Sequence, residues 1–140
     1  MSTRRLRQDG SVAVEVAVLT PALVALLLLV VFAGRVAQAD GDVRRAASAA
    51  ARAASLRQDA TAAEQAAQEM AASNLASSGV ACRDLETLVD TSGFTPGGVV
   101  SVTVRCTASM TDVSLLGLPG HRTFVARSVE YVDRYRGGPD

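Results

Sequence analysis

The strongest pattern in the chain is an uninterrupted apolar run near its N-terminus. The 19 residues from Val16 to Gly34 carry no charged side chain. At about 1.5 Å per helical residue, this run would extend roughly 28 Å, which is close to the ~30 Å hydrocarbon core of a lipid bilayer. The pattern therefore predicts a membrane-spanning helix over residues 11–35.

A second helical pattern follows the apolar run. Residues 43–77 contain 15 alanines in 35 positions, with arginine, glutamate and glutamine spaced between them, and alanine has the highest helix propensity. The sequence Thr61-Ala62-Ala63-Glu64 fits a capping box, and Asp59 could cap the same helix instead. We therefore expect one helix from about Ser11 to Leu56 and a second from about Thr61 to Ser77.

Beyond Gly79 the pattern changes from helical to alternating, as expected for strands. Weaker strand candidates are residues 85–90 and 124–133, and Thr95-Pro96-Gly97-Gly98 supplies a turn. The clearest strand places apolar residues on one face, namely Val100, Val102, Val104, Cys106 and Ala108. These elements predict an α+β fold, in which the second helix packs on the apolar face of a small antiparallel sheet of about three strands.

The elements divide the chain into four parts. Residues 1–10 form a basic leader and residues 11–35 the membrane helix. Residues 36–60 are expected to form an alanine-rich helical stalk, and residues 61–140 an α+β domain.

One carboxylate stands at the start of the apolar run. Glu15 would be costly to bring near lipid, which invites a functional explanation. Gly10 lies five residues before it, and Arg4, Arg5 and Arg7 lie upstream. This order is typical of a short basic leader, a cleavage point and a helix that assembles into a filament. The alternative is that Glu15 reaches the interface of an ordinary signal anchor.

These residues resemble a known family. Asp9-Gly10-Ser11-Val12-Ala13-Val14-Glu15, followed by Leu19-Thr20-Pro21 and a leucine-valine run, resembles the type IV pilin-like processing signal. It is similar in particular to the TadE-like family of the tight-adherence (Flp) pilus system. The resemblance continues through the alanine-rich stretch, the two cysteines and the closing Tyr135-Arg136-Gly137.

The resemblance implies a minor pilin or pseudopilin. A prepilin peptidase would cut after Gly10 and leave Ser11 as the new N-terminus. Glu15 would then meet the N-terminal ammonium of a neighbouring subunit and direct docking. The implied partners are other pilins or pseudopilins and the inner-membrane platform proteins of the Tad system. Major pilins commonly begin with phenylalanine, so the polar Ser11 favours a minor subunit.

The topology follows from the length of the flanks and from the cysteines. Three arginines stand on each side of the apolar run, so the charge rule does not decide the orientation. The N-terminal flank is short, however, and long C-terminal domains translocate largely regardless of charge. We therefore expect a single-pass protein of the bacterial cytoplasmic membrane, with a cytosolic N-terminus and an exported C-terminal domain that could enter a pilus.

Cys82 and Cys106, the only cysteines, both lie in the part expected to be exported, where a lone pair indicates a disulfide. A bridge between them would close a loop of 25 residues and contribute roughly 3 kcal/mol. Together with His121 they are one ligand short of a structural zinc site. We therefore expect no metal and no cofactor.

Composition and motifs exclude several functions. The formal net charge is zero and aromatic residues make up 4% of the chain. Because the arginines are scattered and not interleaved with aromatic residues, we expect no nucleic-acid surface. The sequence also has no phosphate-binding loop and no paired catalytic carboxylates. It therefore predicts a structural protein without a small-molecule substrate, not an enzyme.

Two alternatives to a pilus-assembly protein remain. The first is a signal-anchored binding module of the cell envelope that prepilin peptidase does not process. The second is a secreted protein, since Ala37-Gln38-Ala39 fits a signal-peptidase site. The length of the apolar run and Arg35 just before that site favour an uncut anchor.

Overall fold

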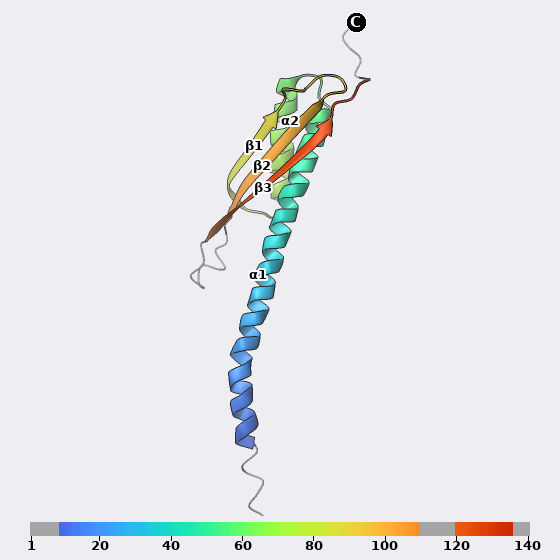
Figure 1. The fold of residues 1–140 in the computed structure, drawn as a ribbon. Helices are drawn as coiled ribbons and strands as arrows, with labels where there is room; N and C mark the ends of the chain where they lie inside the picture. Colours follow the sequence, from blue (N-terminus) through green and yellow to red (C-terminus); the bar gives the residue numbers. More distant parts are fainter. Residues whose placement is uncertain (1–8, 110–119, 136–140) are drawn as a thin grey trace, which may run out of the picture. The chain divides into compact units, whose positions relative to one another are not determined.

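A computed structural model describes residues 9–109 and 120–135 of the chain, so the leader arginines Arg4, Arg5 and Arg7 lie outside the described residues. The α+β class predicted from the sequence is confirmed, and within the described residues two helices precede three strands (Figure 1). The elements are α1 (Asp9–Ser55), α2 (Ala60–Ser77), β1 (Cys82–Asp90), β2 (Val99–Ser109) and β3 (His121–Tyr131).

The chain forms two compact units, residues 1–37 and residues 38–140. In the first unit α1 carries the apolar run. From Val14 to Val31 its large aliphatic side chains are between 49% and 67% exposed. Among the described residues α1 is the one helix that is long and apolar enough to cross a membrane. A continuous apolar surface of this kind requires a nonaqueous environment or a partner.

The second unit is built on an antiparallel sheet with the strand order β1-β2-β3. Leu88 of β1 lies opposite Thr103 of β2, and Thr103 lies opposite Arg127 of β3. The β1–β2 turn closes tightly, because a β-carbon on Gly98 would lie 2.1 Å from the carbonyl oxygen of Gly93. Only glycine fits at position 98, which agrees with the turn predicted there.

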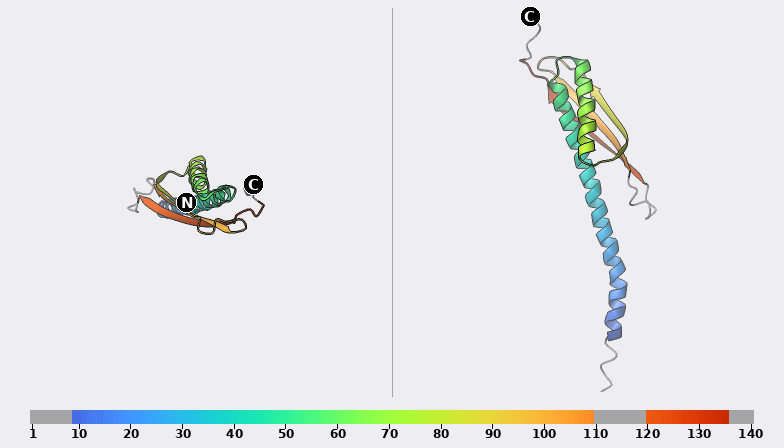
Figure 2. Two further views of the ribbon diagram at one scale, coloured as in Figure 1. Left: turned by 90° about the horizontal axis from the view of Figure 1, so that it is seen from above. Right: turned by 180° about the vertical axis from the view of Figure 1, so that it is seen from behind.

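The core of this unit lies between the helices and one face of the sheet (Figure 2). Figure 2 shows α2 and residues 38–55 of α1 on the same side of the sheet, and α2 contacts β1. The helices contribute mainly alanines, whose small side chains allow close packing. The buried apolar residues are Val43, Ala46, Ala47, Ala50, Ala51, Ala54, Ala63, Ala66, Ala67, Ala71, Leu75, Val100, Val102, Val104, Cys106, Ala108, Phe124, Ala126 and Val132.

Residues 36–60, which were expected to form a helical stalk, include residues that are buried in the second unit. The compact second unit begins at Gln38, and Val43, Ala46 and Ala50 are fully buried in it. The last part of α1 thus belongs to the core that the sheet and α2 share.

The break between the helices lies where the sequence predicts it, but Asp59 is the residue that caps α2. The backbone N–H of Ala62 donates to Asp59 Oδ1 at 2.8 Å, and Asp59 has an extended backbone. Of the two caps that the sequence allowed, the structure therefore shows Asp59 and not the capping box at Thr61-Ala62-Ala63-Glu64. The helix already begins at Ala60, so Thr61 lies inside its first turn.

Candidate functional site

The first candidate site is the N-terminal part of α1. Gly10 and Ser11 lie in the first turns of the helix, and Glu15 follows about one turn after Ser11. The Glu15 side chain is exposed and stands directly before the apolar run. Arg35, at the far end of the run, lies about 30 Å from Glu15 along the helix axis. That separation precludes an ion pair between the two within this helix.

A polar hydroxyl and a proline follow Glu15 in the same segment. The Thr20 hydroxyl donates to the carbonyl oxygen of Val16 at 2.7 Å, so the helix itself satisfies this hydroxyl. Pro21 lies inside α1 and has no N–H, so it cannot donate to the carbonyl of Ala17. Membrane helices tolerate this loss where neighbouring groups compensate. Glu15 is the ionisable side chain that directly precedes the apolar run.

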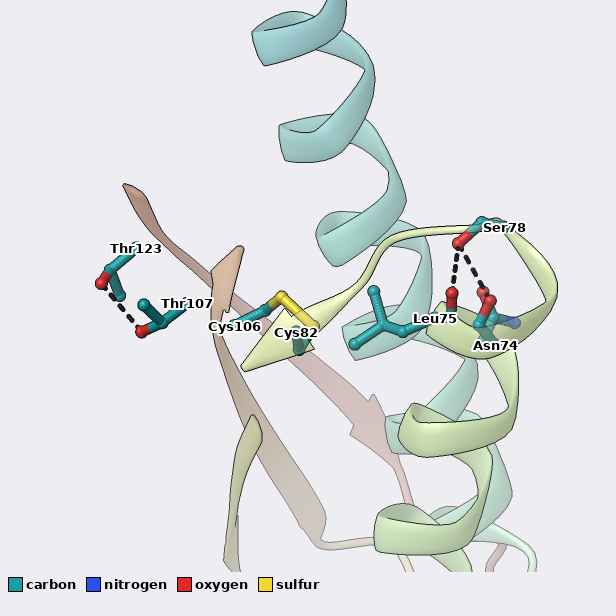
Figure 3. Close-up of a disulfide and its surroundings, with 7 residues drawn as sticks. All are labelled: Asn74, Leu75, Ser78, Cys82, Cys106, Thr107 and Thr123. Carbon is teal, nitrogen blue, oxygen red and sulfur yellow. Dashed lines mark hydrogen bonds between the residues drawn. A yellow bond between two sulfur atoms is a disulfide. The ribbon is translucent and has the colours of Figure 1, made fainter. Parts of the chain in front are cut away.

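The second candidate feature is the disulfide. The structure joins Cys82 and Cys106, the two residues that the sequence analysis paired, with their Cα atoms 5.4 Å apart. Figure 3 shows the bridge beside Leu75 of α2, and Leu75 is only 2% exposed. Ser78, just after the helix, donates its hydroxyl to the Leu75 carbonyl at 3.1 Å. The disulfide therefore ties the start of β1 to β2 where α2 ends.

Register explains how the cysteines meet. Cys106 is paired directly with Leu85, and Cys82 with Ala108. The pairing shifts between Cys82 and Asp84, which leaves Arg83 as an extra residue in β1. This irregularity, which the sequence analysis did not predict, brings Cys82 within reach of Cys106.

The sequence analysis did not predict the buried carboxylate of Asp42 in α1. Asp42 is 1% exposed, and one of its oxygens accepts a hydrogen bond from Arg45 Nη2. Its Oδ2 atom is buried without a hydrogen-bond partner in the part of the chain that the structure describes. Two residues before it, half-buried Asp40 accepts a hydrogen bond from Arg44 Nε at 2.8 Å. The only indication of this site in the sequence is the pair of acidic residues Asp40 and Asp42 just before the alanine-rich stretch.

His121 is exposed and is the first residue of β3. Within residues 9–109 and 120–135, no group of three histidine, cysteine, aspartate or glutamate side chains could hold a metal ion.

Comparison with known proteins bears on the N-terminal helix. Residues 10–52 match the family model described as TadE-like protein. This segment is TadE-like. The match confirms the resemblance seen in the sequence, begins at Gly10 and lies wholly within α1. It covers well under half of the chain. Neither the curated proteins nor the solved structures gave a significant match.

The TadE-like match and the apolar helix together support a membrane protein associated with a Tad system. The TadE-like family is a structural, pilus-associated family and not an enzymatic one. The three-stranded sheet lies outside the matched residues, so its role must be argued from its own geometry.

Proposed function

We propose that the protein is a TadE-like minor pilin or pseudopilin that assembles a tight-adherence (Flp) pilus or a related secretion filament. The observation that carries the proposal is the TadE-like match, which starts at Gly10 and includes both Glu15 and the apolar run. Prepilin peptidase would cut after Gly10 and make Ser11 the N-terminus of the mature protein. Other pilins and the inner-membrane platform proteins would be its partners.

Glu15 would direct docking between subunits. An unpaired carboxylate in a nonpolar environment costs several kcal/mol, whereas pairing with an ammonium removes most of that cost. Cleavage before Ser11 creates such an ammonium on every mature subunit. Because the apolar run contains no other charged side chain from Val16 to Gly34, the pairing would fix one register between neighbouring helices.

The position of the disulfide supports export of the second unit. Disulfides persist mainly in oxidising compartments, and Cys82–Cys106 lies within residues 38–140. With the second unit exported, the N-terminus of α1 would lie in the cytosol, where the peptidase would meet Gly10. The mature protein would then be a single-pass protein of the cytoplasmic membrane or a subunit of the pilus.

The first test is the N-terminal residue of the protein purified from membranes of its native host. Ser11 would support prepilin-type processing. An uncut N-terminus would favour the signal-anchored envelope binding module instead, and Asp40 would indicate a secreted protein cut after Ala39.

The second test separates docking from processing. Glu15→Gln keeps the size of the side chain and removes its charge. We expect cleavage after Gly10 to continue, while pilus assembly, measured by electron microscopy and by shearing of surface filaments, falls strongly. Val18→Ala, a change on the same helix that leaves every charge in place, is the matched control. Normal piliation in the Glu15→Gln strain would contradict the docking role.

A further inference from the structure

The two cysteines of the disulfide lie in different surroundings. Cys106 is fully buried on the inner face of β2, between Val104 and Ala108, which are also buried. Cys82 is half-buried and is the first residue of β1. One bond therefore joins a cysteine inside the core to a cysteine that is partly open to solvent.

The chain around Cys82 is open on both sides of it in the sequence. Ala81 before it and Arg83 and Asp84 after it are exposed. Figure 3 shows the bridge between β1 and β2, with Cys82 where the connection from α2 enters the sheet. A thiol in solution can therefore approach Cys82 from the start of β1. The route to Cys106 passes through the layer packed between the sheet and the helices.

The strand register allows the sheet to form before the bridge closes. Residues 84–90 of β1 pair continuously with residues 101–107 of β2. Cys82 pairs with Ala108 on the other side of the shift at Arg83, outside this continuous ladder. The ladder therefore does not depend on Cys82, and a Cys82 thiol would lie at the rim of a sheet that is otherwise paired.

We propose that Cys82 is the site at which a dithiol–disulfide oxidoreductase of the exported compartment acts on this protein, and that Cys106 completes the reaction from inside the core. The partner is defined by its chemistry, as a protein that carries a reactive disulfide in a Cys-X-X-Cys sequence. Access decides which sulfur exchanges. The difference in burial between the two cysteines therefore assigns the first step to Cys82.

The reaction has two steps. The Cys82 thiol loses its proton, and its sulfur attacks the disulfide of the oxidoreductase, which forms a mixed disulfide and releases one oxidoreductase sulfur as a thiolate. The Cys106 thiolate then attacks Cys82 Sγ, which closes the bridge and releases the second oxidoreductase sulfur. The two cysteines are oxidised, the oxidoreductase disulfide is reduced to a dithiol, and the two protons of the cysteines pass to the released thiolates.

The same assignment holds for the reverse reaction on the folded protein. A thiolate that reaches Cys82 Sγ forms a mixed disulfide there and releases the Cys106 sulfur. The cysteine that reacts first can therefore be identified in the natural protein, without any substitution.

This inference goes beyond the assembly function. The choice of Cys82 over Cys106 rests on burial and register, and it needs neither cleavage after Gly10 nor a pilus. The oxidoreductase partner requires in addition that residues 38–140 are exported.

Exchange with reduced glutathione tests the assignment on the natural full chain in detergent. The folded, oxidised protein is exposed briefly to the thiol and quenched with acid, and its free thiols are then blocked with N-ethylmaleimide in urea. Peptide mass spectrometry locates the two labels. We expect at least about tenfold more glutathione on Cys82 than on Cys106, because access limits the attack. The control is the same exchange in urea, where both cysteines are exposed and should carry similar amounts.

Trapping in cells tests the partner. Cys106→Ala removes the cysteine that completes the reaction, so a mixed disulfide at Cys82 should persist. Cys82→Ala is the matched control, because both variants lose the same bridge. The variants are produced in the native host, and membrane proteins are separated on a nonreducing gel. We expect Cys106→Ala to give a thiol-sensitive adduct with a Cys-X-X-Cys protein, in at least about tenfold excess over Cys82→Ala.

Similar glutathione labelling of the two cysteines in the folded protein, or more on Cys106, would contradict the assignment of Cys82. An adduct that forms equally well with Cys82→Ala would contradict it too. No adduct from either variant, or an adduct with a protein that lacks a Cys-X-X-Cys sequence, would overturn the oxidoreductase as the partner. These readouts do not involve pilus assembly or processing at Gly10, so each result leaves the proposed function untouched.

Discussion

Cys82 and Cys106 join the start of β1 to β2, with Cys106 fully buried beneath the helices and Cys82 half-buried at the rim. The bridge lies beside Leu75, where α2 ends and the chain turns into the sheet (Figure 3). The disulfide therefore links β2 covalently to the start of β1, close to the connection between α2 and the sheet.

Removal of the disulfide should destabilise the second unit. The bridge closes a loop with a sequence separation of 24, for which chain entropy predicts a contribution of roughly 3 kcal/mol. Cys82→Ala/Cys106→Ala should lower the melting temperature by roughly 10 °C or more in a domain of this size. The measurement is thermal unfolding of the full chain in detergent, followed by circular dichroism.

The double variant carries its own control. A thiol reductant should lower the melting temperature of the natural protein and leave that of the variant unchanged. Equal melting temperatures for the two proteins without reductant would contradict a stabilising disulfide.

The cap of α2 gives a second prediction with a matched control. Asp59→Ala removes the acceptor for the Ala62 N–H and should cost about 1 kcal/mol of unfolding free energy. Thr61→Ala removes a hydroxyl that lies inside the first turn and is exposed, so it should change stability by less than about 0.5 kcal/mol. Urea titration of both variants measures the change in unfolding free energy. A larger decrease for Thr61→Ala than for Asp59→Ala would favour the capping box over Asp59 as the cap.

The sequence predicted the elements well because local signals set them. The expected helix end near Leu56 and restart near Thr61 differ from the observed Ser55 and Ala60 by one residue. The helix propensity of alanine and the capping Asp59 are sufficient to predict where α1 ends and α2 begins. The alternation from Val100 to Ala108 likewise predicted β2, because one face of that strand is fully buried and the other, apart from Ser101, is half-buried or exposed.

Long-range packing was not predictable in the same way. Ala54 is fully buried whereas Ala53 beside it is not, yet alanine-rich composition is the same for a stalk and for a core. Asp42 shows the same limit, because a carboxylate in a helix normally faces water and its burial depends on what packs over it. The bulge at Arg83 depends on the pairing of β1 with β2, which neither strand encodes alone.

The alanine layer gives a third prediction. Ala67 of α2 is fully buried, so the larger side chain of Ala67→Leu must displace the residues packed against it. The substitution should lower the free energy of unfolding by about 1–3 kcal/mol. Ala72 on the same helix is exposed, and Ala72→Leu should be nearly neutral. Both variants keep helix propensity high, which leaves packing as the difference. Thermal unfolding monitored by circular dichroism measures it, and similar melting temperatures would show that the helix faces are assigned wrongly.

The turn after β1 gives a pH-dependent prediction. Hydrogen bonds from Ser92 to Asp90 Oδ1, at 2.6 Å from the hydroxyl and 3.0 Å from the backbone N–H, hold the pKa of Asp90 below its ordinary value of 3.8. A carboxyl group whose pKa is lower in the folded state than in the unfolded state stabilises the fold above its unfolded value. That stabilisation is lost as the pH falls through the lower, folded value.

Ser92→Ala isolates this effect. It removes the hydroxyl hydrogen bond, which is the larger cause of the lowered pKa of Asp90, and it changes no charged side chain. We expect the variant to melt at a lower temperature than the natural protein at pH 7. The difference should shrink as the pH falls below 3.8, where Asp90 becomes protonated in both proteins. Ser73→Ala, which removes an exposed serine hydroxyl that donates to the Met70 carbonyl, should show no such pH dependence. A difference for Ser92→Ala that stays constant from pH 7 to acid would mean that the hydroxyl stabilises the turn without acting through the charge of Asp90.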